Sequence, residues 1–461
     1  MKHKVKQIHF IGIGGVGMSG IAEVLHNLGY VVTGSDAGQS YNTERLQKLG
    51  MSVFIGHRAE NVGQADVVVT STAIDKSNPE IQNGIERKIP IVPRARMLAE
   101  LMRFKYGIAI AGTHGKTTTT SLAAEVLKEC HLDPTFIIGG KLATTGSNAK
   151  LGEGEYLVAE ADESDASFLF LNPMISVVTN IDLDHMDTYD HDEEKLKQAF
   201  IEFLHKLPFY GRAIVCGEDK RIQQILPAIN RPVTTYGLSD KFDIYATDII
   251  ANGGTMCYNV HIKWLNIVHP IVVNMPGMHN VLNSLSVIAL ALECDGKIDD
   301  IARGLANFHG VGRRCQYYPE INTNDGKSAL LVDDYGHHPV ELKATLSALR
   351  SAYPEKRMVL IFQPHRYTRT RDLFDDFVSV LADVDQLIIT EVYPAGEKPI
   401  ALADGRSLVR AIRLQGNENA IFAEDIDDAK RKLFNVLHDG DLVVTMGAGS
   451  VGKLPAMLIS N

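Results

Sequence analysis

The chain has few cysteines and no long apolar run. Its five cysteines are spread over 461 residues without a C-x-x-C pair, which is typical of reduced thiols and disfavours both a zinc site and a disulfide framework. No window approaches eighteen uninterrupted apolar residues, and residues 1–7 lead into a strand-like segment without the apolar core of a secretory signal. We therefore expect a cytoplasmic protein with no membrane partner.

The chain also has fewer basic than acidic side chains. The chain carries 46 Lys and Arg against 56 Asp and Glu, and it has no dense basic stripe of the kind that binds a nucleic acid backbone. Nucleic acid is therefore not an expected partner. The hydrophobic fraction of 45% and the charged fraction of 22% are those of an ordinary globular protein. Because single hydrophobic cores stop growing near ~250 to 300 residues, we expect three domains.

Short apolar runs that end in glycines or polar residues recur along the chain, each followed by a helix-like stretch. This alternation is typical of parallel sheets with crossover helices and predicts an α/β fold. The expected strands are residues 8–12, 31–34, 67–70, 108–111, 156–160, 175–180, 213–216, 330–333, 358–362, 387–390 and 442–446. In residues 245–274 apolar and polar residues instead alternate around Asn252-Gly253-Gly254, which predicts antiparallel hairpins on the middle domain.

A glycine loop follows the first expected strand. Its G-x-G-x-x-G pattern lets backbone N–H groups approach a pyrophosphate at the start of the helix expected over residues 19–28. Asp36, after the next strand, is placed to accept hydrogen bonds from ribose hydroxyls. The loop predicts a diphosphate nucleotide, and by itself it fits a nicotinamide dehydrogenase equally well. The residues expected at this site are Gly14, Gly15, Val16, Gly17, Met18, Asp36, Ser71 and Thr72.

A second phosphate loop follows the expected strand 108–111. It ends in Gly-Lys-Thr and starts a helix, although Ile110 stands where the usual G-x-x-x-x-G-K-[ST] pattern has its first glycine. In such loops backbone donors cradle the phosphates, a lysine such as Lys116 meets the β and γ oxygens, and a hydroxyl such as that of Thr117 binds Mg²⁺. The expected ATP-binding residues here are Gly112, Thr113, His114, Gly115, Lys116, Thr117 and Thr118.

Acidic and histidine side chains follow the next two expected strands. Glu160 ends the strand 156–160, and His185 comes shortly after the strand 175–180. Because the carboxyl ends of parallel strands face the ligand crevice, both side chains are expected near the phosphates. The predicted metal ligands are Thr117, Glu160 and His185, with contact to the γ-phosphate as the alternative role for His185.

Together these motifs resemble those of the Mur ligase family over essentially the whole chain. The segments that carry the resemblance are GIGGVGM (12–18), AGTHGKT (111–117), EADES (160–164), DHM (184–186), HNVLN (279–283) and GRR (312–314). The segments DDYGHHP (333–339) and QPHRYTR (363–369) are similar to those of the branch that adds L-alanine. The resemblance implies a Rossmann-like domain of residues 1–105 for the UDP-sugar, a P-loop ATPase-like domain of residues 106–312 for ATP, and a Rossmann-like closing domain of residues 313–461 for the amino acid.

The resemblance also implies roles for single residues. It places adenine near Asn283 and Asn280, and it sends one arginine of Arg313 and Arg314, with Arg314 preferred, to the γ-phosphate. The amide of Asn283 matches adenine N6 and N7, whereas helix capping explains Asn280 equally well. Asp334 completes the expected ATP-binding set. Some relatives carry a carbamylated lysine where this chain has Phe200. The sequence therefore leaves open whether a second metal ion binds.

The implied reaction joins L-alanine to the carboxylate of UDP-N-acetylmuramate and converts ATP to ADP and phosphate. A carboxylate is a poor electrophile, so ATP first activates it as an acyl phosphate, which a neutral amine then attacks. The catalytic residues expected for these steps are Lys116, Glu160, His185, Arg314 and, as a candidate base, His337. The residues expected to bind alanine or a substrate carboxylate are Tyr335, His337, His365, Arg366 and Arg369, with an exposed basic loop as the alternative.

Other interpretations of the same residues stay open. A ligase that recycles a whole peptide onto the same sugar nucleotide shares the implied chemistry. An NAD-dependent dehydrogenase accounts for the first loop but leaves the Gly-Lys-Thr loop without a role, and a non-catalytic nucleotide sensor leaves the arginines and histidines of residues 313–369 without one. The sequence also leaves open the oligomeric state, the order of substrate binding and the preference for alanine over glycine or serine.

Overall fold

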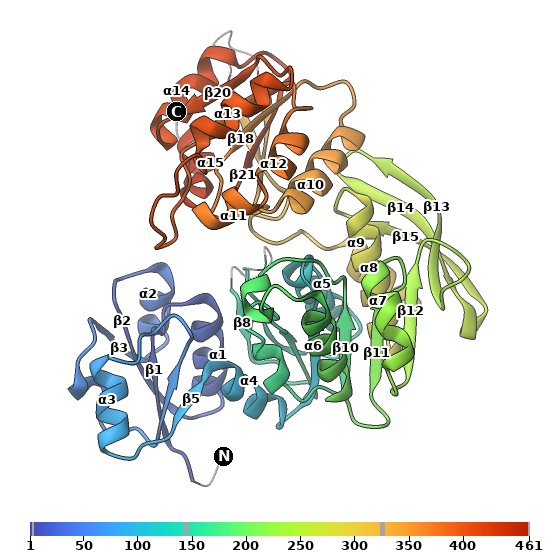
Figure 1. The fold of residues 1–461 in the computed structure, drawn as a ribbon. Helices are drawn as coiled ribbons and strands as arrows, with labels where there is room; N and C mark the ends of the chain where they lie inside the picture. The colour runs from blue at the N-terminus through green and yellow to red at the C-terminus, as the bar shows by residue number, and fades with distance from the viewer. Residues whose placement is uncertain (2–3, 141, 143–146, 323–327, 460–461) are drawn as a thin grey trace. The chain divides into compact units, whose positions relative to one another are not determined.

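The structure is a computed structural model that describes residues 1, 4–140, 142, 147–322 and 328–459. In this part of the chain the strands form three sheets, one after another along the sequence, with helices between the strands (Figure 1). The α/β class expected from the alternating apolar runs is confirmed. Each of the eleven strands predicted from the sequence is present, with ends that differ by no more than a few residues.

The first sheet has five parallel strands in the order β3-β2-β1-β4-β5. Its central strand β1 buries Ile8, Phe10 and Ile11 completely. The strands are β1 (Gln7–Ile11), β2 (Val31–Asp36), β3 (Ser52–Ile55), β4 (Val67–Thr70) and β5 (Ile91–Pro93), and the helices are α1 (Val16–Asn27), α2 (Tyr41–Lys48), α3 (Pro79–Glu86) and α4 (Arg94–Met102). This order reverses direction at β1 and β4, where ligands of such sheets bind.

The second sheet has ten strands in the order β15-β14-β13-β12-β11-β10-β6-β9-β7-β8. The strands are β6 (Tyr106–Ala111), β7 (Thr135–Ile137), β8 (Ala149–Lys150), β9 (Tyr156–Glu160), β10 (Ile175–Val178), β11 (Arg212–Cys216), β12 (Val233–Gly237), β13 (Ile244–Asn252), β14 (Thr255–Ile262) and β15 (Ile267–Val273). The helices are α5 (Lys116–Glu129), α6 (Glu193–His205), α7 (Lys220–Ile225), α8 (Met278–Glu293) and α9 (Ile298–Ala306). Strands β7, β9, β6, β10, β11 and β12 run parallel.

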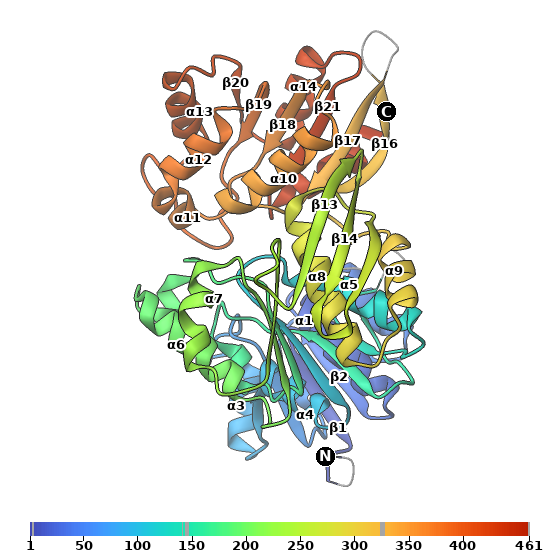
Figure 2. The same ribbon diagram turned by 90° about the vertical axis from the view of Figure 1, so that its right-hand side faces the viewer.

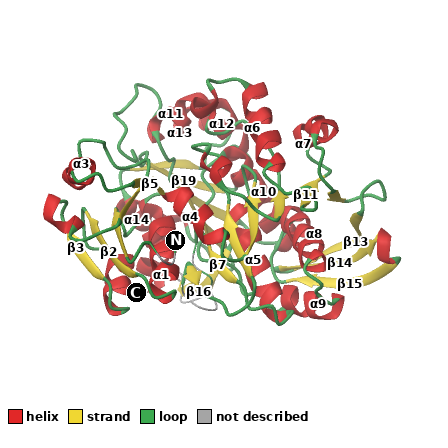
Figure 3. Cartoon of the chain, turned by 90° about the horizontal axis from the view of Figure 1, so that it is seen from below, coloured by secondary structure: helices red, strands yellow, loops and turns green. Residues whose placement is uncertain are grey.

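The hairpins predicted for residues 245–274 are the strands β13, β14 and β15, which are consecutive neighbours at one end of this sheet. Figure 2 shows β13 and β14 as a long ribbon, and Figure 3 shows all three strands side by side. The turn between β13 and β14 is made by Gly253 and Gly254, and Gly253 has a φ of 56°, a conformation that glycine adopts without strain.

The third sheet has the order β16-β17-β21-β18-β19-β20, and only β16 runs antiparallel to its neighbour. The strands are β16 (Gln316–Asn322), β17 (Ser328–Asp334), β18 (Met358–Phe362), β19 (Gln386–Thr390), β20 (Ala420–Ala423) and β21 (Leu442–Met446). The helices are α10 (Pro339–Ala352), α11 (Tyr367–Asp372), α12 (Phe374–Leu381), α13 (Gly405–Leu414), α14 (Ile426–Val436) and α15 (Leu454–Ile459).

Both faces of the third sheet are covered. Leu360 and Phe362 of β18 pack with α10, α12 and α13 in one apolar cluster, whereas Val359 and Ile361 pack with α14 and α15 in another. Successive side chains of a strand point to opposite faces, so this division explains why the strand reads as an unbroken apolar run. The expected doubly covered, mostly parallel arrangement is therefore confirmed for this sheet.

By their internal contacts the described residues form two compact units. One unit holds the first sheet and most of the second, and comprises Met1–Ile249, Tyr258–Val272 and Val281–His309. The other holds the third sheet and one end of the strands β13, β14 and β15, and comprises Ile250–Cys257, Val273–Asn280 and Gly310–Asn461. The boundaries expected at residues 105 and 312 stay predictions, although each sheet lies within one predicted domain. Within the described ranges, no helix has the length and apolar character needed to cross a membrane.

Candidate active site

The first glycine loop lies between the carboxyl end of β1 and the start of α1. Its backbone is held by β2, because Gly12 and Ile13 donate to the carbonyl oxygen of Ser35 at 2.8 and 2.9 Å, and Gly14 donates to Oδ2 of Asp36 at 2.8 Å. A Cβ on Gly14 would lie 2.8 Å from the same carboxylate oxygen. The predicted ribose acceptor Asp36 thus also shapes the loop.

The other residues predicted for the UDP-sugar occupy the same edge of the first sheet. Helix α1 begins at Val16 with Gly15 before it, so its first backbone N–H groups face the loop, as an anion site requires. Ser71 and Thr72 directly follow β4, the neighbour of β1. Carboxyl ends of adjacent parallel strands share an edge, so the structure brings this predicted set together.

The second loop connects β6 to α5 and is braced by the end of β10. His114 N donates to Oδ1 of Asn180 at 2.8 Å, and Nδ2 of Asn180 donates to the carbonyl oxygen of His114 at 2.9 Å. Gly112 and Gly115 have φ angles of 128° and 84°, and a Cβ on Gly112 would lie 2.1 Å from Oγ1 of Thr179. Both glycines are therefore required by the shape of the loop.

Lys116 is the first residue of α5, and its ammonium lies inside the loop. Nζ donates to the carbonyl oxygens of Gly112 and Thr113 at 2.7 and 3.1 Å and pairs with the Glu163 carboxylate at 2.8 and 3.0 Å. Burial lowers the pKa of Lys116, but the carboxylates of Glu163 and Asp162 outweigh it and hold the pKa above its usual value. Lys116 is thus a positively charged group at neutral pH.

The carboxylates after β9 differ in their partners. Glu160 accepts a hydrogen bond from Gly139 N at 2.7 Å, and Asp162 accepts one from Ser164 N at 3.1 Å. Arg94, from α4, lies 3.8 Å from Asp162, and a Cβ on Gly17 would lie 2.7 Å from its Nη1 atom. Arg94 therefore lies between the first glycine loop and the acidic segment after β9, within one compact unit.

His185 and Asn283 are two further predicted residues of this unit. His185 has a φ of 56°, and its Nε2 atom lies 3.5 Å from Oδ2 of Asp184, so its imidazole has an acidic neighbour. Asn283, on α8, approaches the phosphate loop, because a Cβ on Gly115 would lie 3.0 Å from its Oδ1 atom. Phe200, at the position of the carbamylated lysine of some relatives, is fully buried and packs edge-on against Phe168.

Asn280 and Arg313 have partners that give them structural roles in the other unit. The Asn280 amide donates to the carbonyl oxygen of Pro276 at 2.7 Å, one turn before Asn283. Nε of Arg313 donates to the fully buried Asp333 carboxylate at 2.8 Å, and its Nη2 atom donates to the carbonyl oxygen of Gly447 at 2.6 Å. The ATP contacts predicted for these two side chains stay predictions.

Arg314 is held more loosely than its neighbour. Its Nη1 atom lies 3.9 Å from Glu341, and its guanidinium lies 5.2 Å from the ring centre of Tyr335. Asp334 is buried and accepts hydrogen bonds from the backbone N–H groups of Gly336 and Cys315 at 2.7 and 2.8 Å. Of the two arginines, Arg313 is therefore the one that is hydrogen-bonded to a buried carboxylate, whereas the ion pair of Arg314 is a longer contact with Glu341.

An aromatic row lines the carboxyl ends of β17, β18 and β19. Ring centres lie 5.5 Å apart for Tyr335 and His337, for His337 and His365, and for His365 and Tyr393, and the last pair is stacked. Burial lowers the pKa of both histidines to about 4, with nearby Arg369 acting in the same direction. Both imidazoles are therefore neutral at pH 7, the state in which His337 accepts a proton.

Arg366 and Arg369 sit at the start of α11, next to this row. Arg366 has a φ of 71° and donates its backbone N–H to the carbonyl oxygen of Tyr393 at 2.9 Å. The structure thus brings together four of the predicted residues, Tyr335, His337, His365 and Arg366, and adds Tyr393, which the sequence analysis missed. Tyr393 could have been predicted from its position three residues after the end of β19, because that end lies on the same sheet edge as His365.

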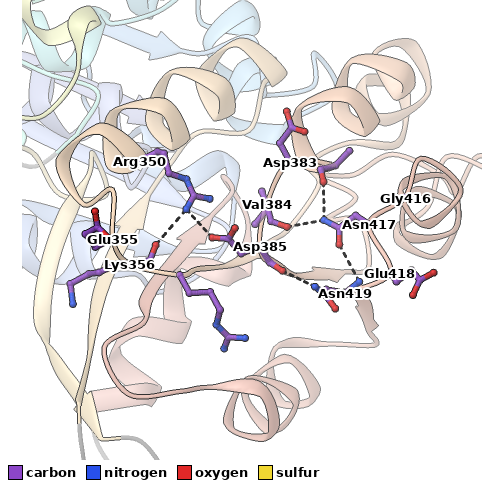
Figure 4. A pocket seen from close by; sticks show the side chains of 12 residues that line it. Arg350, Glu355, Lys356, Asp383, Val384, Asp385, Gly416, Asn417, Glu418 and Asn419 are labelled. Atoms are coloured by element: carbon purple, nitrogen blue, oxygen red, sulfur yellow. Dashed lines mark hydrogen bonds and ion pairs between the residues drawn. The ribbon is translucent and has the colours of Figure 1, made fainter.

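A hollow of about 860 Å³ lies at the opposite edge of the third sheet (Figure 4). Its walls include the residues just before β18, β19 and β20, so it opens at the amino ends of these strands. Arg350 pairs there with Asp385 at 2.8 Å, and the amide of Asn417 donates to the carbonyl oxygen of Val384 at 2.8 Å. Since ligands of such sheets bind at the carboxyl ends, this hollow is not part of the candidate site.

Comparison with known proteins agrees with this arrangement of two phosphate loops and a third sheet. Family models match in three consecutive parts: the Mur ligase family catalytic domain at residues 7–106, the Mur ligase middle domain at 110–291 and the Mur ligase glutamate ligase domain at 313–449. The chain belongs to the Mur ligase family. As members of this family are ATP-dependent ligases, the predicted enzyme class and the predicted use of ATP are confirmed.

Individual Mur ligases match over the full length. The chain is 60% identical to the UDP-N-acetylmuramate–L-alanine ligase of Neisseria meningitidis, over 100% of this chain and 98% of that protein. Among solved structures, the UDP-N-acetylmuramate–alanine ligase of Thermotoga maritima has a TM-score of 0.82 and 27% identity over 98% of both chains. A murein peptide ligase of Psychrobacter arcticus has a TM-score of 0.72 and 23% identity, covering 99% of this chain and 98% of its own, which shows the shared fold.

Proposed function

We propose that this Mur ligase joins L-alanine to the carboxylate of UDP-N-acetylmuramate during the synthesis of peptidoglycan precursors. The observation that carries the proposal is 60% identity, over the whole chain, to a ligase named for this reaction. The two phosphate loops in one compact unit support it, because the reaction needs a site for a UDP-sugar and a site for ATP. Neither the peptide-recycling ligase nor the dehydrogenase is favoured by a comparable match.

In this proposal the three parts of the chain divide the substrates. Residues 1–105 hold the UDP-sugar, with its diphosphate against the loop that Asp36 and Ser35 brace. Residues 106–312 hold ATP, with the phosphates in the loop around Lys116 and the adenine near Asn283, whose amide adjoins Gly115. Residues 313–461 bind the amino acid at the aromatic row.

Activation of the sugar acid is the first chemical step. A carboxylate oxygen of the muramate attacks the γ-phosphorus of ATP; the new O–P bond forms as the bond to the β-phosphate oxygen breaks, which yields an acyl phosphate and ADP. Negative charge on the transferring group is met by the ammonium of Lys116 and the guanidinium of Arg314. Lys116 is suited to this because its neighbours keep it protonated.

The residues around the phosphate loop also fit Mg²⁺. The hydroxyl of Thr117 and the carboxylate of Glu160 are hard oxygen donors of the type that this ion prefers, and Glu160 lies close enough to Lys116 to raise the pKa of that ammonium. Mg²⁺ would neutralise phosphate charge there. The imidazole of His185, beside Asp184, is the predicted third contact, to the metal or to the γ-phosphate.

Amide formation is the second chemical step. The neutral amine of alanine attacks the carbonyl carbon of the acyl phosphate, the C–N bond forms, and the bond to the phosphate oxygen breaks. The amine loses a proton, for which the neutral imidazole of His337 is the proposed acceptor. Arg366 and Arg369 bind the alanine carboxylate, while Tyr335 borders its methyl group.

Substrate-dependent ADP production tests the proposal. With ATP and Mg²⁺ present, ADP should form only when UDP-N-acetylmuramate and L-alanine are both added, because neither step proceeds without its acceptor. ADP production from ATP alone, or oxidation of NADH by the protein, would contradict the proposed reaction.

A further inference from the structure

Glu163 is a buried carboxylate that neither chemical step uses. Its side chain is 2% exposed and faces the ammonium of Lys116, with Nζ to carboxylate oxygen distances of 2.8 and 3.0 Å. It belongs to the segment that begins at the last residue of β9, Glu160, and also carries Asp162. Its position therefore places a carboxylate beside the group that is proposed to bind phosphate.

The ammonium of Lys116 has no hydrogen left for a nucleotide in this arrangement. A lysine ammonium has three N–H donors, and four oxygens surround Nζ within 3.1 Å: the carbonyl oxygens of Gly112 and Thr113 and both carboxylate oxygens of Glu163. A phosphate oxygen can be bound only if at least one of these acceptors is given up. The acceptor most strongly opposed by an arriving phosphate is the carboxylate, because both carry negative charge.

The backbone of Glu163 is anchored close to the phosphate loop. Its carbonyl oxygen accepts a hydrogen bond from the hydroxyl of Tyr189 at 2.5 Å and another from Ala166 N at 3.0 Å. The neighbouring carboxylates accept hydrogen bonds from backbone groups rather than from Lys116: Glu160 accepts one from Gly139 N, and Asp162 accepts one from Ser164 N. The charge of Glu163 therefore remains near the phosphates after the nucleotide has bound.

We infer that Glu163 competes with nucleotide phosphate for the ammonium of Lys116 and so limits the affinity of the site for ADP and ATP. The pair keeps Lys116 charged and the loop ordered before the nucleotide arrives, and the retained negative charge favours departure of ADP after the reaction. The inference rests on the proposed ATP site, and it adds Glu163 as a residue that sets nucleotide affinity through Lys116.

Calorimetric titration of the full chain with ADP in excess Mg²⁺ tests this inference. Glu163→Gln keeps the shape of the side chain and an oxygen acceptor but removes its charge, and the Kd for ADP should fall about tenfold. Asp165→Asn is the matched control, because it removes a charge from the same segment at a carboxylate that caps the backbone of Ser167; its Kd should stay within about twofold of the wild type. An unchanged or higher Kd for Glu163→Gln overturns the inference.

A crystal structure of the wild-type protein with ADP and Mg²⁺ gives an independent test that needs no stable variant. Competition predicts that Nζ of Lys116 contacts the β-phosphate and moves more than about 4 Å from the Glu163 carboxylate. A bound β-phosphate with the Lys116–Glu163 pair still intact contradicts it. Neither measurement requires turnover, so failure of the ligase assay and failure of this inference are distinguishable.

Discussion

Lys116 has two roles, one in holding the phosphate loop together and one in the proposed reaction. Its ammonium ties two loop carbonyl oxygens and Glu163 together, and the proposed reaction assigns it to the transferring phosphoryl group. Lys105 offers a comparison in the same unit, since its ammonium bonds the carbonyl oxygens of Gly152 and Gly154 at 2.7 and 2.5 Å and has no proposed part in catalysis.

Replacing Lys116 should abolish phosphate release. Lys116→Ala removes the positive charge from the phosphates and leaves Glu163 buried without its partner, a situation that costs about 3 to 5 kcal/mol of folding free energy. Lys105→Ala should lower the melting temperature but leave turnover per folded molecule near that of the wild type. Near-normal phosphate release by Lys116→Ala, measured with all three substrates, would remove Lys116 from the mechanism.

Arg369 should be needed for alanine more than for ATP. Loss of a charged hydrogen bond to the alanine carboxylate in Arg369→Ala is expected to raise the KM for alanine roughly tenfold to a hundredfold, with a much smaller change in the KM for ATP. Arg371 lies on the same helix but pairs with Asp372 at 2.7 Å and is 55% exposed, so Arg371→Ala is the control. Equal KM values for alanine in the two variants contradict the assigned role.

The sequence allowed single site residues to be predicted where they follow a buried strand. Lys116, Glu160, His365 and Arg366 were predicted in this way, because a strand end positions the next few residues on a known edge of the sheet. Pairings between distant segments were not predictable. Glu163 meets Lys116 across 47 positions of the chain and Arg313 meets Asp333 across 20, and no local pattern indicates which carboxylate an individual cation meets.

Helix α3 is joined to the first sheet by a buried polar cluster around Glu80. The carboxylate accepts hydrogen bonds from Ser35 Oγ at 2.5 Å and Asn61 Nδ2 at 2.6 Å, and Nε2 of His9 lies 3.5 Å away. Burial raises the pKa of Glu80, but its hydrogen bonds to His9, Ser35 and Asn61 together lower it to about 2. Because Ser35 also accepts from the glycine loop, this cluster supports the proposed UDP-sugar site.

The stability contributed by Glu80 should depend on pH. The pKa is about 2 in the folded chain, against 4.5 for an unperturbed glutamate side chain, so the contribution is fully present above about pH 4.5 and is lost as the pH falls towards 2. It amounts to about 3 kcal/mol. Denaturant unfolding should therefore show Glu80→Gln less stable than the wild type by about this amount at pH 7, with a gap that narrows below pH 4. A gap that is constant from pH 7 to pH 3 contradicts this account.

The elements that the sequence predicted and those it missed differ in how they are buried. Strands such as β1 and β18 are covered on both sides and read as unbroken apolar runs, so they were found. Strands β3, β5 and β8 are short and lie at or near a sheet edge, where their side chains are polar, exposed or few. These segments form strands because a neighbouring strand pairs with them, and their own sequences do not predict a strand.

Across the whole chain, two phosphate loops with different requirements belong to one compact unit, and an aromatic row with two neutral histidines belongs to the other. In the proposed function the first unit binds the UDP-sugar and ATP. In the proposed function the second unit selects the amine, since Tyr335, His337 and His365 line the edge where the amine is proposed to bind. The identity of the amine therefore distinguishes the alanine-adding reaction from peptide recycling.

The decisive measurement is phosphate release with UDP-N-acetylmuramate and ATP, recorded for a panel of amino acids and for the tripeptide that a recycling ligase would attach. The proposed function predicts the highest kcat/KM for L-alanine, lower values for glycine and L-serine, and no release with the tripeptide. Release that is fastest with the tripeptide, or that is independent of the added amine, would contradict it.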